Sequence, residues 1–410
     1  MRSRLILSNI ILFVLALISF LPQVRVFSFF NQLWAALMIL WLLVSLTIGK
    51  RAIFNRSKYR MYVGVFVLYT VLISYFFGNG VIGNRFLELS QLYLFYIGYE
   101  INKYYGFHYY NKRIIYGLIP FIVATCLTTI RALLVNPFAS RDILERGAVE
   151  RASTSVGGYG FIYFIVVIFC SLLFYFGRNS MPRKHRLTVL SLLGLLFVTV
   201  LLSNFMTGLL LCLFALVMRI FFPRLSKGRA IIIVTVGVFI FLFFEPIIVL
   251  ISDAALAYLG DSLNASRVKE IRDLLIKGNS GASVTARADT YSQSFKLFLN
   301  NPFFGIIVDP IRRVGAGVSG FGQHSQVLDT FALFGFLIGT IQVYLIGNPI
   351  AKRINFKTKQ NNNLPLIMLI VAFSLATVNN LTPSIGFAIF FIFPVIHDEV
   401  LMRENKLAYV

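Results

Sequence analysis

Residues 266–305, SRVKEIRDLLIKGNSGASVTARADTYSQSFKLFLNNPFFG, form the centre of a long polar segment that extends from 252 to 324. The segment carries six acidic and eight basic residues and ends at His324, where a new apolar run begins. Most of the remaining sequence is apolar: of 410 residues, 58% are hydrophobic and only 13% are charged. Soluble domains carry about 25% charged residues. The sequence therefore predicts an all-α polytopic membrane protein with one large loop at 252–324.

The formal net charge of +22 would, in a soluble protein, suggest a nucleic-acid partner. Here the basic residues are scattered between apolar runs, as in the cytoplasmic loops of membrane proteins, so no nucleic-acid partner is expected. The three cysteines (Cys126, Cys170 and Cys212) lie inside apolar runs and predict no disulfide framework. The sequence shows no cluster of metal-ligating residues, so neither a metal nor a cofactor is expected.

Apolar windows of about 20 residues predict about twelve membrane-spanning helices within one integral membrane domain, residues 1–410. The first window is interpreted as a span rather than a signal peptide, because no small-residue cleavage site follows it. The predicted spans lie at 5–21, 30–49, 61–78, 86–101, 114–135, 158–177, 187–204, 206–222, 230–251, 325–346, 364–380 and 384–397.

The distribution of basic residues predicts the orientation of these spans. With the N-terminus inside, every loop predicted to face the cytoplasm is basic, as the positive-inside rule requires. These basic groups occur within 50–60, 103–113, 178–186, 219–229 and 352–359. We therefore expect both termini in the cytoplasm and the loop at 252–324 on the outer face.

Helical periodicity within the outer loop predicts two short helices, at 266–277 and 285–299. In the second, an apolar face is expected from Ala288, Tyr291, Phe295 and Phe298. Arg287 would lie in its first turn, where free backbone N–H groups favour an anion. Asn300-Asn301-Pro302 would end this helix.

Basic residues on the outer side depart from the positive-inside rule. Arg141, Arg146 and Arg151 lie in the predicted outer loop between the fifth and sixth spans. Snorkelling toward lipid headgroups explains single arginines at such positions. Several arginines together with Arg287 favour an outward-facing anion site, because a guanidinium donates paired hydrogen bonds to phosphate.

His324 is the strongest single candidate for a catalytic group, because it alone of the four histidines is predicted to face outward. The alternative is a structural histidine at a helix start. Asp329, about one turn further along, would either orient the ring or satisfy a neighbouring span. Glu245, in the ninth predicted span, is a further candidate, since a carboxylate inside a membrane is a functional candidate by default; pairing with an arginine is the alternative.

These residues carry a family resemblance. Arg287, then Asn301-Pro302-Phe303-Phe304-Gly305, then His324-Ser325 with Leu328 and Gly335 after it, resemble the O-antigen polymerase and O-antigen ligase superfamily. The resemblance covers the topology of the whole chain and short motifs over 285–339. It implies a fold similar to the GT-C class of glycosyltransferases, in the bacterial cytoplasmic membrane.

The resemblance implies roles for particular residues. The arginine before the family's Asn-Pro-x-x-Gly segment matches Arg287, and the histidine at the next span matches His324. The family's earlier arginine matches Arg151 best, although Arg146 and Arg141 remain alternatives. Three departures stand out: Gly157-Gly158-Tyr159 replaces Asn-Pro-Asn, Ser325 replaces Asn, and Gly339 takes the place of a displaced glycine.

By resemblance, the expected activity is polymerisation of undecaprenyl-pyrophosphate-linked repeat units into O-antigen, capsule or exopolysaccharide, by inverting and metal-independent glycosyl transfer. Donor and acceptor would both be lipid-linked, and a chain-length regulator and a flippase would be partners. An O-antigen ligase is the close alternative. A non-enzymatic polysaccharide flippase is a further one, but it predicts short loops and internal repeats rather than the segment at 252–324.

Overall fold

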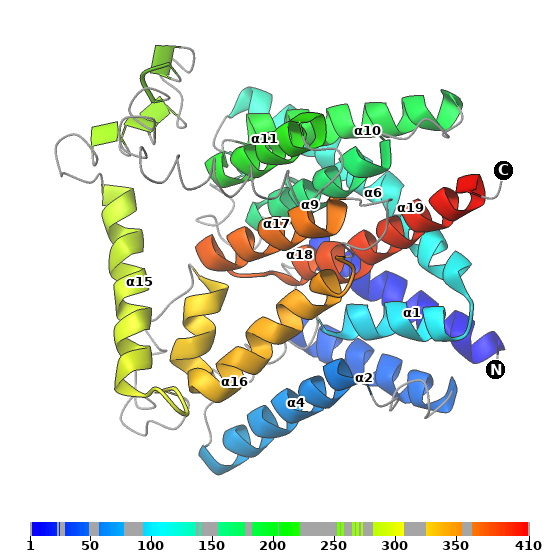
Figure 1. Cartoon of the computed structure of the whole chain (residues 1–410), viewed down its shortest axis with the longest axis vertical. Coiled ribbons are helices and arrows are strands. Elements are labelled where there is room, and N and C mark those ends of the chain that lie inside the picture. Colours follow the sequence, from blue (N-terminus) through cyan, green and yellow to red (C-terminus); the bar gives the residue numbers. More distant parts are fainter. Residues whose placement is uncertain are drawn as a thin grey trace.

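The computed structural model describes most of the apolar part of the chain (Figure 1). The described residues are 2–22, 24, 29–48, 57–77, 93–136, 139–140, 155–176, 183–203, 205–221, 252–254, 256–257, 265–266, 268–269, 272–273, 282–306, 325–354 and 363–408. Throughout these ranges all regular secondary structure is helical. This confirms the predicted fold class at the level of an all-α protein.

The N-terminal half of the chain forms helices close to the predicted spans. They are α1 (Arg2–Phe20), α2 (Phe30–Ile48), α4 (Lys58–Phe77), a helix at 93–104, α6 (His108–Val135), α9 (Tyr159–Phe176), α10 (Arg183–Leu202) and α11 (Met206–Phe221). The predicted span at 86–101 is described only from residue 93. The predicted span at 230–251 lies outside the described residues.

The C-terminal half contains the elements that follow the polar segment. They are α15 (Ala282–Asn300), α16 (Gln326–Ala351), α17 (Leu364–Val378), α18 (Pro383–Phe387), the π-helical turn η4 (Ala388–Ile392) and α19 (Phe393–Ala408). α15 confirms the second helix predicted in the loop. Of the first, at 266–277, the structure describes only 266, 268–269 and 272–273, and these residues are helical.

Six of the described helical stretches are long and apolar enough to cross a membrane, namely Arg2–Phe20, His108–Val135, Tyr159–Phe176, Arg183–Leu202, Gln326–Ala351 and Pro383–Met402. Gln32–Ile48, Thr207–Phe221 and Leu364–Val378 are shorter apolar helices. These helices identify the chain as a multi-spanning membrane protein. The full count of about twelve spans stays a prediction.

α9 forms the centre of the bundle, since it packs against α10, α11, α17, α18 and α19. Most of its side chains are buried, as expected for a helix that is apolar on all sides. Phe164 of α9 stacks on Phe20 of α1 at a ring distance of 5.0 Å. Phe387 joins this core by packing against Phe95 at 4.9 Å and Phe391 at 5.1 Å.

α15 differs from the other helices in direction. In Figure 1, α10, α11 and α19 run across the view, whereas α15 stands upright along the left edge beside the first part of α16. Among the side chains of α15 that the structure describes, those of 289–300, Ser294 and Leu297 are buried, whereas Phe295 is 50% exposed. Phe295, a member of the predicted apolar face, therefore lies outside the contact with α16, because α15 turns its small polar Ser294 toward α16.

Candidate functional site

The candidate site lies where α15 and its following turn contact the start of α16. Ser294 Oγ donates a hydrogen bond to Asp329 Oδ1 at 2.9 Å, and both residues are buried. Four residues further along α15 and two further along α16, Phe298 packs on Phe331 with ring centroids 5.7 Å apart. The two helices therefore run in the same direction, and Asp329 is bonded to α15, the helix of the predicted outer loop. Its two predicted roles, orienting the His324 ring or satisfying a neighbouring span, stay predictions.

The turn Asn301–Gly305 inserts into a break in α16. The Phe336 N–H, immediately after the break, donates to the Pro302 carbonyl at 2.6 Å. Gly305 and Gly335 both have φ near +70°, at +67° and +69° respectively, a region that side chains disfavour. A Cβ on Gly305 would collide with the Leu333 backbone, and one on Gly335 with the Phe303 backbone.

This break divides the predicted span at 325–346 into two parts. α16 consists of a first part, 326–334, and a second part, 336–351, joined by the non-helical Gly335. In Figure 1 the first part runs beside α15 and the second turns toward the middle of the bundle. Hydropathy does not detect the break, because apolar residues continue on both sides of it.

The start of α16 is fixed by polar contacts on the opposite side from α15. Ser325 caps the helix, since its Oγ accepts from the Leu328 N–H at 3.2 Å. The Gln326 N–H donates to the Asn379 carbonyl at 3.1 Å, and the Gln326 side chain accepts from the Leu381 N–H at 3.3 Å. Ser325, the residue that follows His324, is thereby held against the connection between α17 and α18.

That connection leads to the start of α9. Ser384 Oγ donates to the Gly160 carbonyl at 3.0 Å, and the Gly157 N–H donates to Thr129 Oγ1 of α6 at 2.8 Å. A continuous series of contacts therefore links Ser325 to 155–160, the segment that follows the predicted arginine loop. Two stretches that the sequence predicts to be functional end in the same part of the bundle.

The predicted site residues themselves are described only in part. Arg287 lies in α15, but because that helix begins at Ala282 it falls in the second turn rather than the first, and its side chain is not described. The argument from free N–H groups at the helix start therefore does not apply to it. His324, Arg151, Arg146, Arg141 and Glu245 lie outside the described residues.

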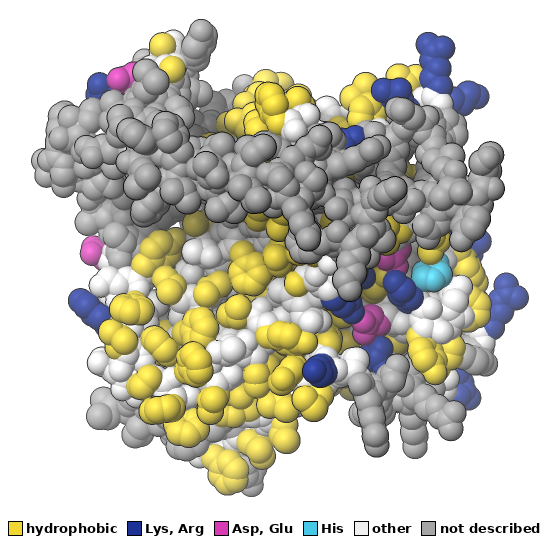
Figure 2. Space-filling view, viewed as in Figure 1, with side chains coloured by type: hydrophobic (Ala, Val, Ile, Leu, Met, Phe, Trp, Pro, Cys, Tyr) yellow, Lys and Arg dark blue, Asp and Glu magenta, His cyan; other side chains and the backbone are white. Residues whose placement is uncertain are grey.

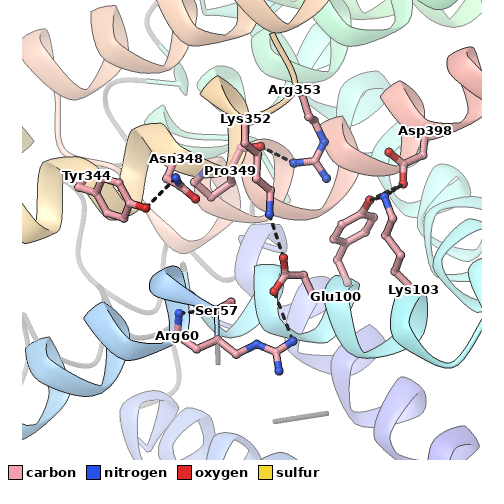
Figure 3. A network of polar contacts seen from close by, with 11 residues as sticks. Ser57, Arg60, Glu100, Lys103, Tyr344, Asn348, Pro349, Lys352, Arg353 and Asp398 are labelled. Atoms are coloured by element: carbon pink, nitrogen blue, oxygen red, sulfur yellow. Dashed lines mark hydrogen bonds and ion pairs between the residues drawn. The ribbon is translucent and has the colours of Figure 1, made fainter. Parts of the chain in front are cut away.

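A second polar cluster occupies the opposite end of the bundle (Figure 3). Glu100 bonds Arg60 of α4 at 3.3 Å and Lys352 at the end of α16 at 2.9 Å. Lys103 pairs with Asp398 of α19 at 2.8 Å. These contacts join helix ends that the charge pattern assigns to the cytoplasmic side.

Arg353 completes this cluster. Its guanidinium lies over the rings of Tyr96, Tyr99 and Phe393 at 5.9, 5.3 and 6.0 Å. Burial lowers the pKa of the neighbouring Lys352, while the Glu100 carboxylate opposes that shift. The sequence showed these residues as scattered basic and acidic groups and gave no signal of their pairing, because the partners lie far apart in the chain.

Among the described residues, no group of three or more His, Cys, Asp or Glu side chains gathers in a form suited to a metal ion.

The fold and these clusters define a multi-spanning, all-helical membrane protein with a broken helix at one end and an ion-paired cluster at the other. No protein-family model and no curated protein matches the chain. The resemblance to the O-antigen polymerase and ligase superfamily therefore rests on the sequence alone, through the predicted topology and the short motifs over 285–339.

Proposed function

We propose that the protein is a polysaccharide polymerase that joins undecaprenyl-pyrophosphate-linked repeat units on the outer face of the bacterial cytoplasmic membrane. The observation that supports this proposal is the docking of Asn301–Gly305 into the break at Gly335. These are two separate pieces of the resemblance, 30 residues apart by their numbers, and in the structure they are in direct contact. Two parts of a motif that contact each other in the structure support the resemblance more strongly than the same residues would if they lay apart.

In the proposed reaction, the acceptor sugar hydroxyl attacks the anomeric carbon of the donor glycan. The new glycosidic C–O bond forms as the bond between that carbon and the pyrophosphate oxygen breaks, which inverts the configuration. The acceptor proton passes to His324, and undecaprenyl pyrophosphate leaves. Histidine suits this role because its unperturbed pKa of about 6.5 lies close to working pH.

Arg287 and Arg151, with Arg146 as an alternative to Arg151, would hold the leaving pyrophosphate. Arginine stabilises the charge that develops on the departing oxygens, and each such donor is worth about 3 kcal/mol in enzymes that use this device. The hydrogen bond between Ser294 and Asp329 would support the site by holding α15 against α16. Asp329 is thus proposed as a positioning residue and Glu245 as a supporting one.

The test is a polymerisation assay with purified protein and lipid-linked repeat units. Arg287→Ala should abolish polymer, and Arg287→Lys should restore it only in part, because a point charge replaces a planar fork. Lys296→Ala is the matched control, since it removes a base from the exposed side of the same helix. Full activity in Arg287→Ala would rule out the pyrophosphate contact.

The same assay tests His324. His324→Ala should lower the rate by about 100-fold or more, the usual contribution of a general base, while donor binding persists through the arginines. A wild-type rate in His324→Ala would exclude this residue as the base. If the protein instead transfers a finished glycan once, to an acceptor that is not lipid-pyrophosphate-linked, it is a ligase rather than a polymerase.

A further inference from the structure

A groove with a cavity volume of about 540 Å³ lies between α6, α9, α10 and α19. This volume is in the range of about 300–1,000 Å³ that is typical of small-molecule sites. Its walls are mainly apolar, and its charged and imidazole-bearing residues are Lys112, His185 and Glu399. The apolar walls include Ile119, Val123, Leu192, Leu195 and Ile396.

The groove has a polar mouth and an apolar interior. Lys112 lies at the start of the second turn of α6, His185 lies in the first turn of α10, and Lys112 pairs with Glu399. From Lys112 the lining continues along α6 to Val123, a distance of about 16 Å at 1.5 Å per residue. The hydrocarbon layer of one leaflet is about 15 Å thick. The groove is therefore about as long as the hydrocarbon layer of one leaflet is thick, which is the depth that a lipid acyl chain spans.

Within the described part of the chain, the sides of α6 and α10 next to the groove are largely exposed. Only 33% of the apolar window of α6 and 22% of that of α10 are buried. Leu190 and Tyr116, on these two helices, are 50% and 63% exposed. In a membrane protein, such exposed apolar helix faces contact acyl chains.

Basic side chains surround the mouth. Arg183, Lys184 and Arg186, in the first turn of α10, are all exposed. The Arg186 guanidinium lies over the Phe176 ring at 5.3 Å, next to the groove-lining Tyr175. Figure 2 shows Lys and Arg side chains gathered on the right of the view, over the end of the bundle where α10 begins. The one acidic residue at the mouth, Glu399, is already neutralised by Lys112.

From this arrangement we propose that the groove binds one anionic glycerophospholipid from the leaflet that borders the basic end of the bundle. An acyl chain would occupy the apolar part between α6 and α10. The headgroup phosphate would lie at the mouth, beside His185 and the bases of α10. A lipid fits better than a soluble anion because nearly all of the lining is apolar, and an anionic lipid fits better than a neutral one because the unpaired charge at the mouth is positive.

The experiment titrates the full-length protein in detergent with phosphatidylglycerol or phosphatidylcholine of identical acyl chains, and counts bound lipids by native mass spectrometry. The wild type should retain one phosphatidylglycerol more tightly than phosphatidylcholine. A double variant, Lys184→Gln with Arg186→Gln, should weaken phosphatidylglycerol binding by about 25-fold, since each base near an anionic headgroup is worth about fivefold. Its binding of phosphatidylcholine should not change.

A second pair of variants tests the apolar part. Leu192→Trp, which fills the groove, should weaken both lipids, whereas Leu190→Trp, on the exposed side of the same helix, should bind like the wild type. Equal affinity of the wild type for the two lipids would overturn the proposal. So would equal retention of phosphatidylglycerol by the Leu192→Trp and Leu190→Trp variants. The charge variant changes only exposed residues, so it remains informative if Leu192→Trp fails to fold.

Discussion

At the scale of single residues, Gly305 and Gly335 determine how the polar segment joins the bundle. Each has a positive φ. Gly305 lies against the backbone of Leu333, and Gly335 lies against the backbone of Phe303. Glycine is required at both positions for two reasons. The positive φ disfavours any side chain, and the opposing backbone leaves no space for a Cβ. The sequence showed Gly335 only as one position of the motif that carries the family resemblance. What it packs against, a turn rather than a helix, depends on a contact between distant residues.

Gly335→Ala should destabilise the protein, because a side chain at positive φ costs about 1–3 kcal/mol and the new methyl group also meets the Phe303 backbone. Thermal unfolding in detergent measures the loss. Gly194→Ala is the control, since nothing lies within 4 Å of the added Cβ in α10 and alanine favours a helix by about 1 kcal/mol over glycine. A melting temperature for Gly335→Ala equal to or above that of the control would contradict the break.

At the scale of elements, the cluster around Glu100 connects α4, the helix at 93–104 and α16. The side chain of Arg60 is only 10% exposed, whereas that of Lys352 is 41% exposed. The two bases therefore respond differently to loss of a partner. A buried charge left alone is costly, but a half-exposed one is hydrated by water.

Glu100→Ala should therefore destabilise the protein by about 1–3 kcal/mol, an estimate below the full cost of breaking a buried pair because Glu100 is partly exposed. Lys352→Ala should cost less than about 1 kcal/mol, since Glu100 keeps Arg60. Melting temperatures of the two single variants and the double variant measure this difference and the coupling between the residues. Equal losses in the two single variants would show that Arg60 does not depend on Glu100.

The helices themselves were largely predictable from the sequence, because a long apolar run in a membrane protein has few alternatives to a helix. α1, α2, α6, α9 and α11 begin and end within a few residues of the predicted bounds, apart from the longer start of α6. The bend of α16 and the exposed face of α15 were not predictable. Both follow from the way that one segment packs on another, and hydropathy carries no information about that.

At the scale of the whole molecule, the structure brings together the helix ends that the charge pattern assigns to one side. Arg4 donates to the Thr47 carbonyl at 3.1 Å, and Arg60, Glu100 and Lys352 meet in the ion-paired cluster. The alternation of all the predicted spans stays a prediction. Which side of the membrane each end faces remains a prediction from the basic loops.

The orientation can be tested with single cysteines. Ser280→Cys, in the predicted outer loop, should react with an impermeant thiol reagent on intact spheroplasts, whereas Lys184→Cys, exposed at the basic end, should react only after lysis. The native cysteines should stay silent, because Cys126, Cys170 and Cys212 are buried. Labelling in the reverse order would invert the topology.

The bend at Gly335 also bears on the thickness of the surrounding bilayer. The part of α16 that follows it, 336–351, is about 24 Å long at 1.5 Å per residue, and the neighbouring α17, with 15 residues, is about 22 Å long. A typical hydrocarbon layer is about 30 Å thick, and helices too short for it draw the leaflets together. The membrane should therefore be thinned beside these two helices, so that headgroups there lie deeper and nearer to the break in α16.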